Sequence, residues 1–163
     1  MIQERLFATP QHELTSDDYY TPAWVFERMG IRFDLDVCAP PGGIPWIPAD
    51  RYYTQADDGL TSTWTGRVWM NPPFSGTSPW VDKFIAHGNG VCLVPHSRAR
   101  WHARLWASEC ATVDVNAQGD SMFNFYRASD GRMTNIYMPV FMAAIGDECV
   151  EAISRLGPMR VLS

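Results

Sequence analysis

Short apolar segments alternate with helix-start signals along most of this chain, and this alternation limits the fold more than any other feature. Five segments have the length and apolar character of strands: 33–37, 51–54, 67–70, 90–95 and 111–115. A residue that can cap a helix precedes proline at Thr21-Pro22 and at Ser78-Pro79, and each pair opens a stretch with helical periodicity. Strands that alternate with helices predict an α/β fold.

The pattern changes after residue 115. Two apolar segments, 122–126 and 136–145, flank Asp130-Gly131, a dipeptide typical of hairpin turns. Further helices are predicted at 98–109 and 147–156 from their amphipathic spacing. We therefore expect an α/β sandwich with a mixed, mostly parallel sheet and a C-terminal antiparallel hairpin. In such sheets ligands bind at the carboxyl ends of the strands.

Length and composition indicate one folded domain. The chain has 163 residues, of which 46% are hydrophobic and 13% aromatic, and this is sufficient for a sizeable core. We expect a single domain over residues 17–163, preceded by an N-terminal arm over residues 1–16. No run of 18 apolar residues occurs, and the arm lacks the apolar centre of a signal peptide. These features predict a cytoplasmic protein without a membrane anchor.

Cysteine spacing and charge argue against two classes of function. The four cysteines are far apart in the sequence and form no CxxC pair, which predicts buried thiols and no metal site. The net charge of −5 argues against broad, non-specific coating of nucleic acid. A local basic segment nevertheless exists at residues 97–104, where SRARWHAR contains three arginines.

The tetrapeptide Asn71-Pro72-Pro73-Phe74 directly follows an apolar strand, although it suits neither a strand nor a helix. Pro73 has no N–H group, so it continues neither a sheet ladder nor a helical turn, and it holds Pro72 extended. The Pro72 carbonyl is therefore free to face a cavity. The Asn71 side chain offers a second acceptor, and Phe74 offers a flat apolar face.

This set of groups suits a planar ring that carries an exocyclic amino group. The two amino hydrogens would bond to the Asn71 side-chain oxygen and the Pro72 carbonyl, while the ring stacks on Phe74. Two such acceptors would localise the nitrogen lone pair and stabilise the positive charge that develops when the nitrogen attacks an electrophilic carbon. The alternative is a proline-terminated strand followed by a core phenylalanine.

Five motifs occur in an order that resembles phage-type DNA N6-adenine methyltransferases (Dam-like), which use S-adenosylmethionine. The motifs are DDYYTP at 17–22, FDLDVCA at 33–39, RYYTQADDGL at 51–60, the segment ending in NPPF at 64–74, and VCLVP at 91–95. The resemblance covers roughly residues 17–145. It implies a Rossmann-like methyltransferase sandwich that methylates adenine N6 on a base flipped out of DNA, with Asn71 to Phe74 as the catalytic tetrapeptide.

The resemblance also implies a cofactor site at the ends of the first strands. Its candidate residues are Thr21, Pro22, Asp36, Cys38, Ala39, Asp57 and Asp58. Asp36 would bind the cofactor's ammonium group, and Thr21 with Pro22 would lie near its carboxylate. Asp58 is favoured over Asp57 for the ribose hydroxyls or the adenine amino group. The loop reads DVCAPPGG, which departs from the glycine-rich form of many methyltransferases.

Basic side chains in two segments are candidates for DNA phosphate contacts. The basic ones are Arg98, Arg100 and Arg104 in the SRARWHAR segment, and Arg127 and Arg132 beside the predicted hairpin turn; the Ser97 hydroxyl is a further candidate. A solvated helix face and a solvent-crossing loop are the alternative interpretations. No pattern encodes an oligomeric state, and no segment corresponds to a separate target-recognition domain.

Three other functions remain open from the sequence. The same tetrapeptide would suit a methyltransferase that acts on cytosine N4 or on a protein glutamine. A non-catalytic DNA- or protein-binding module on the same fold is the third, because the cofactor loop is short and proline-rich and the chain is acidic.

Overall fold

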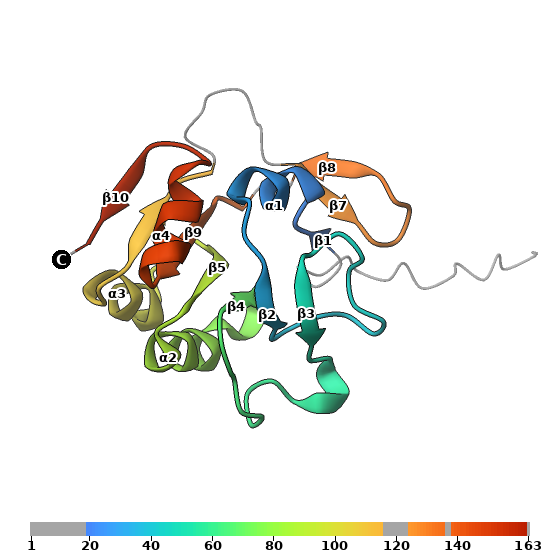
Figure 1. Ribbon diagram of the computed structural model, residues 1–163, viewed down its shortest axis with the longest axis horizontal. Coiled ribbons are helices and arrows are strands. Elements are labelled where there is room, and N and C mark those ends of the chain that lie inside the picture. Colours follow the sequence, from blue (N-terminus) through green and yellow to red (C-terminus); the bar gives the residue numbers. More distant parts are fainter. Residues whose placement is uncertain (1–18, 116–123, 136–137, 163) are drawn as a thin grey trace, which may run out of the picture.

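The computed structural model describes residues 19–115, 124–135 and 138–162, which form two sheets flanked by helices (Figure 1). Its α-helices are α1 (Ala23–Met29), α2 (Thr77–His87), α3 (Arg100–Ala107) and α4 (Asp147–Ser154). The predicted start of α1 needs a correction, because Pro22 occupies the N-cap position and no side chain caps the helix. Gly30 ends this helix in the left-handed conformation, as its position in the sequence predicts.

The larger sheet has seven strands in the order β10-β6-β9-β5-β4-β2-β3. They are β2 (Phe33–Asp36), β3 (Ala49–Tyr52), β4 (Val68–Met70), β5 (Gly90–Pro95), β6 (Ala111–Val113), β9 (Val140–Ile145) and β10 (Met159–Val161). The pairings make β2, β3, β4, β5 and β6 run in one direction, while β9 and β10 run in the other. The expected mixed α/β architecture is confirmed.

The smaller sheet is antiparallel and contains β1 (Tyr19–Tyr20), β7 (Asn124–Arg127) and β8 (Met133–Asn135). The predicted turn at Asp130-Gly131 joins β7 to β8. The predicted partner strand at 136–145 is wrong, since β9 pairs with β5 and β6 in the larger sheet. The physical reason is that β9 is buried almost along its whole length and requires cover on both faces. Residues 122, 123, 136 and 137 of that prediction lie outside the described residues.

Two hydrophobic cores cover the two faces of the larger sheet. Alternate residues of β4 serve opposite cores: Trp69 packs with α1 and α4, whereas Val68 and Met70 pack with α2 and α3. All three are almost completely buried. This period-2 alternation is what a strand covered on both faces requires.

The connectivity around β2 creates a crevice at one edge of the sheet. β2 lies between β3 and β4, and it pairs in parallel with both (Figure 1). The chain leaves β2 to form β3 on one side and later returns to form β4 on the other. At such a switch point the connections diverge, and ligands of α/β sheets bind there. The residues that follow β2 and β4 therefore share one location.

Candidate functional site

A cavity of about 520 Å³ lies at the carboxyl ends of β2 and β4. Four stretches contribute to its wall: Asp36 to Pro41 at the end of β2, Ile44 and Ile47 in the proline-rich loop, Thr54, Gln55, Asp58 and Gly59 after β3, and Asn71 to Pro73 after β4. Tyr20, Trp69 and Trp80 complete it. The structure thus brings the two predicted strand-end sites, Asp36 and Asn71, into one cavity.

Asn71 and Pro72 supply two free acceptors to this cavity. Neither the Asn71 side chain nor the Pro72 carbonyl is hydrogen-bonded within the described part of the chain. The neighbouring Pro73 carbonyl is occupied, since it accepts a bond from the Gly76 N–H at 3.1 Å and from the Thr77 hydroxyl at 3.3 Å. The pair of acceptors predicted from NPPF is therefore available.

Phe74 is not among the residues of the cavity wall, contrary to the role predicted for its ring. It begins the short 3-10 helix η3 (Phe74–Gly76) and packs, half-buried, against the core that contains Trp69. Pro73 and this tight turn direct the chain into α2 and turn Phe74 toward the core. The aromatic rings that do line the cavity are those of Tyr20, Trp69 and Trp80.

Asp36 is a buried carboxyl group without a cationic partner. The residue is 3% exposed, and the Cys38 N–H donates a hydrogen bond to its Oδ1 at 3.2 Å. Burial raises the pKa of Asp36 to about 7, and the Cys38 bond opposes that rise. No ion pair among residues 19–115, 124–135 and 138–162 includes it. A cationic ligand would relieve the cost of this buried charge.

Thr21 and Pro22 are buried beside the cavity and do not line it. The Thr21 hydroxyl is a buried side-chain oxygen for which the described residues supply no hydrogen-bond partner. The Thr21 carbonyl accepts a bond from the Trp46 indole at 2.8 Å, which fastens the proline-rich loop to the segment before α1. An orphaned hydroxyl at this place is a position for a polar ligand group.

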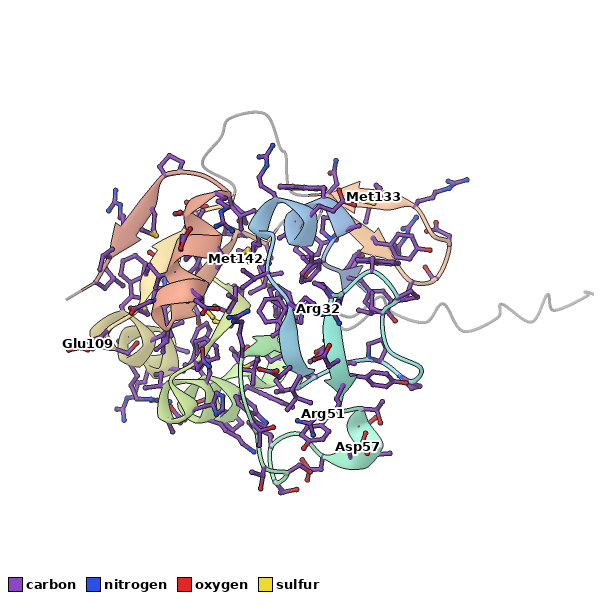
Figure 2. All side chains as sticks on the ribbon, viewed as in Figure 1. Arg32, Arg51, Asp57, Glu109, Met133 and Met142 are labelled. Carbon is purple, nitrogen blue, oxygen red and sulfur yellow. The ribbon has the colours of Figure 1, made fainter. Side chains whose placement is uncertain are left out.

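The two acidic candidates after β3 have different roles. The Asp57 carboxylate accepts bonds from the N–H of Thr54 at 2.8 Å and from its hydroxyl at 3.0 Å, so it caps the short helix η2 (Gln55–Asp57; Figure 2). Asp57 is not in the cavity wall, whereas Asp58 is. Asp58 has a left-handed backbone with φ of 50° and accepts a bond from the Leu60 N–H at 3.2 Å. The preference for Asp58 thus agrees with the cavity wall.

Several wall residues were missed by the sequence reasoning. Cys38 and Ala39 line the cavity as expected, but Gly59 and Trp80 were not predicted to. A Cβ at Gly59 would lie 2.2 Å from the Val37 carbonyl oxygen and 2.9 Å from the Trp80 ring, so only glycine fits there. The DGL signature could have indicated Gly59. Trp80 shares the spacing of the apolar residues Val81, Phe84 and Ile85 in its helix, and no signal in the sequence separates it from them.

None of the predicted DNA-contact residues lines the cavity. Arg104 bonds Asp82 through two nitrogens, at 2.7 and 3.0 Å, and thereby joins α3 to α2. Arg127 pairs with Asp130, and the Ser97 hydroxyl accepts a bond from the Ala99 N–H at 3.0 Å. The remaining three arginines are exposed and form no ion pair within the described residues: Arg98, Arg100 and Arg132.

The described residues form neither a metal-binding cluster nor a membrane-spanning helix. Histidine, cysteine and acidic side chains of that part of the chain nowhere gather in a group of three that could hold a metal ion. Its helices are all too short or too polar to cross a membrane.

Comparisons with known proteins place the chain in a family. The sequence model of the family described as DNA N-6-adenine-methyltransferase (Dam) matches residues 8–103, which is more than half of the chain and includes Asp36 and Asn71. A curated relative, the DNA N-6-adenine-methyltransferase of Haemophilus phage HP1 (strain HP1c1), is 37% identical over 75 residues. That alignment covers 43% of this chain and 42% of the relative, so the chain spans about two fifths of the relative's length. No solved structure matches the chain.

Proposed function

The chain belongs to the DNA N-6-adenine-methyltransferase (Dam) family, and from this membership we propose that it transfers a methyl group from S-adenosylmethionine to N6 of an adenine flipped out of DNA. The observation that carries the proposal is the single cavity shared by Asp36 and Asn71. One residue is a buried carboxyl group suited to a cationic cofactor, and the other is a free amide acceptor suited to an amino group.

The residues of the cavity fit the cofactor. When bound, S-adenosylmethionine supplies an electrophilic methyl carbon. The Asp36 carboxylate would hold the ammonium group, because it is buried and has no cationic partner among the described residues. Thr21 and Pro22 lie beside the cavity and not in its wall, and we assign the cofactor's carboxylate to this side because the Thr21 hydroxyl is orphaned there. Asp58 would accept bonds from the ribose hydroxyls, and Cys38 and Ala39 line the same cavity.

The fold supports the same assignment. We take residues 17–163 as one catalytic domain with the Rossmann-like methyltransferase sandwich, and residues 1–16 as an arm. The support is the parallel order β3-β2-β4-β5, with helices on both faces and the cavity at its switch point.

The tetrapeptide activates the adenine amino group. The Asn71 side-chain oxygen and the Pro72 carbonyl accept its two hydrogens, which favours a pyramidal nitrogen with a localised lone pair. The same oxygens stabilise positive charge as it develops on that nitrogen. A strong general base is unnecessary, because the protonated product amine loses its proton readily to water. Pro73 and Phe74 act as positioning residues, since their carbonyls bond the Thr77 hydroxyl at 3.3 and 3.2 Å.

Exposed arginines near the carboxyl end of β5 and in the β7–β8 turn would bind the DNA backbone. Arg98, Arg100 and Arg132 are the free guanidinium groups of the six candidate residues within the described part of the chain. Their contacts would help to offset the few kcal/mol that extrusion of a base costs. Arg104 and Arg127 hold structure together instead, through Asp82 and Asp130.

Mass spectrometry of nucleosides tests the proposal. DNA incubated with the chain and S-adenosylmethionine should yield N6-methyladenine. N4-methylcytosine would instead indicate the cytosine enzyme, and methylation of protein glutamine without any modified nucleoside would indicate the protein methyltransferase. A chain that releases no heat when titrated with S-adenosylmethionine would be a non-catalytic module, and the proposal would then be wrong.

A further inference from the structure

Lys83 is the only lysine among the 13 lysines and arginines of the chain, and it lies on α2. Its ammonium donates to three backbone carbonyls of one loop: that of Gly59 at 2.9 Å, that of Leu60 at 3.0 Å, and that of Ser62. All three donors of the ammonium are thus used within a single turn of chain. This use leaves the group no role as a phosphate contact on the surface.

The site suits lysine and not arginine. Three acceptors that converge on one point match a compact ammonium, whereas a guanidinium presents its donors in a planar fork. The Trp64 ring lies 4.9 Å from the Lys83 nitrogen, and the Trp64 indole donates to the Gly59 carbonyl at 2.7 Å. Burial lowers the pKa of Lys83, and the nearby Asp58 carboxylate opposes this effect.

The loop that Lys83 holds forms one wall of the cavity. It carries Asp58, whose backbone is left-handed, and Gly59, which is packed between the Val37 carbonyl and the Trp80 ring. A residue other than glycine at φ of 50° is strained and needs surrounding contacts to keep it there. Lys83 supplies such contacts from outside the cavity.

The helix that carries Lys83 also follows the catalytic tetrapeptide. α2 begins at Thr77, three residues after Phe74, and its Trp80 lines the cavity. Lys83 lies less than one helical turn beyond Trp80. The Lys83 ammonium therefore joins the loop that would hold the cofactor to the helix that follows the catalytic tetrapeptide.

We propose that Lys83 is a positioning residue for the cofactor: by fixing the Asp58–Ser62 loop to α2, it keeps the cofactor-binding wall of the cavity in the conformation that binds the cofactor. The inference rests on the proposed function, since it takes S-adenosylmethionine as the ligand of this wall. It predicts that loss of the ammonium weakens cofactor binding while the chemistry on a saturated enzyme changes little.

The test compares Lys83→Met with Arg155→Met in the full chain. Lys83→Met keeps an unbranched side chain beside Trp64 but removes the three donors. Arg155→Met also removes a cation that bonds a backbone carbonyl, that of Met29, but it does so between α4 and α1 and away from the cavity. Calorimetric titration with S-adenosylmethionine gives Kd, and steady-state methylation gives KM and kcat.

For Lys83→Met we expect Kd and KM for S-adenosylmethionine to rise about tenfold or more, equivalent to about 1.4 kcal/mol. Its kcat at saturating cofactor and its KM for DNA should stay within about threefold of the wild type. Arg155→Met should leave Kd unchanged even where it lowers Tm. Equal Kd values for Lys83→Met and wild type, or an equal rise in both variants, would overturn the inference.

A second measurement needs no variant. Lys83 and the N-terminus are the two primary amines of the chain, so acylation followed by mass spectrometry reports Lys83 against an internal reference. Saturating S-adenosylmethionine should slow the labelling of Lys83 at least threefold, because cofactor and loop stabilise each other reciprocally. An unchanged rate in a chain that binds the cofactor would refute the role of Lys83. Absence of cofactor binding in the wild type would instead refute the proposed function itself.

Discussion

The position of the Asp36 carboxyl group is unfavourable for the stability of the free protein. The residue is 3% exposed, and its pKa rises from a usual value near 3.8 to about 7 because burial disfavours the charged form. That shift corresponds to a cost on the order of 4 kcal/mol for the carboxylate in the free protein. Such a cost is tolerated at binding sites, where a ligand of opposite charge recovers it.

Cofactor binding should depend on pH through Asp36. The ammonium of the cofactor requires the carboxylate form, so Kd should fall by up to tenfold per pH unit as pH rises from 5.5 to about 7, and then level off. The free protein has the opposite dependence. The stabilisation from its raised pKa is complete below pH 3.8 and is lost as pH rises through about 7.

Asp36→Asn tests both pH dependences, that of cofactor binding and that of the stability of the free protein, because it keeps the size of the side chain and removes the titrating group. It should bind the cofactor weakly at every pH, and its free form should be more stable than the wild type at pH 8, because no charge is buried. Calorimetry and thermal denaturation across pH measure the two quantities. A pH dependence of Kd that persists in Asp36→Asn would assign the titration to another group.

Asn71 provides the second test at this scale. Asn71→Ala removes one of two acceptors that act on the developing charge, so kcat should fall by about 10²-fold or more. Kd for S-adenosylmethionine should stay nearly unchanged, because the Asp36 side of the cavity is intact. Asn71→Asp keeps an acceptor oxygen and should retain more activity than Asn71→Ala. Tritiated-methyl incorporation into DNA at the wild-type rate by Asn71→Ala would contradict the assignment.

At the scale of elements, local patterns predicted the parts of the chain that obey local rules. The strand that ends at Asp36 and the one that ends at Met70 were predicted within one residue, because the first alternates apolar and acidic residues, the second is continuously apolar, and turn residues bound both. The partner of the hairpin was not, because strand pairing is decided by burial in the whole sheet. The prediction that the Phe74 ring lies in the cavity was wrong because its direction is also set by tertiary packing. The turn η3 and the core behind it determine where the ring points.

Arginines in and just before helix α3 are of two kinds, exposed ones and one that pairs with an aspartate. The salt dependence of DNA binding should distinguish them. Arg98→Ala with Arg100→Ala removes exposed guanidinium groups at the start of α3, so the slope of log K for DNA against log salt should become shallower by about two. Arg104→Ala loses the Asp82 pair that joins α3 to α2, so it should lower Tm and leave the slope unchanged. Filter binding at several salt concentrations gives the slopes. A shallower slope for Arg104→Ala alone would reverse the assignment.

At the scale of the whole molecule, the site exists because distant segments become neighbours in the sheet. Asp36 and Asn71 are brought together because β2 and β4 pair in parallel, with Asp36 opposite Trp69. The sequence allowed that meeting to be predicted from the rule that parallel strands end at the same edge. The sequence could not reveal that Trp80 and Tyr20 line the cavity or that Lys83 bonds the loop after Asp58. These contacts depend on how α2 and β1 pack against loops far away in the sequence.

Ligand binding at this site should stabilise the whole fold. At a cofactor concentration 100 times Kd the gain is about 2.7 kcal/mol, which for a chain of this size raises Tm by about 5–10 °C. Asp36→Asn should lose this rise, while Asn71→Ala should keep it. Thermal denaturation with increasing S-adenosylmethionine measures both. An equal rise in Tm for Asp36→Asn and the wild type would place the cofactor elsewhere.

A crystal structure of the chain with S-adenosylhomocysteine tests most directly whether one cavity holds donor and acceptor. We predict density for the ligand in the cavity at the ends of β2 and β4, with its ammonium nitrogen within hydrogen-bond distance of the Asp36 carboxylate and its sulfur facing the Asn71 side chain. Density away from Asp36, or a ligand whose sulfur is separated from Asn71 by the wall of the cavity, would contradict the proposed mechanism.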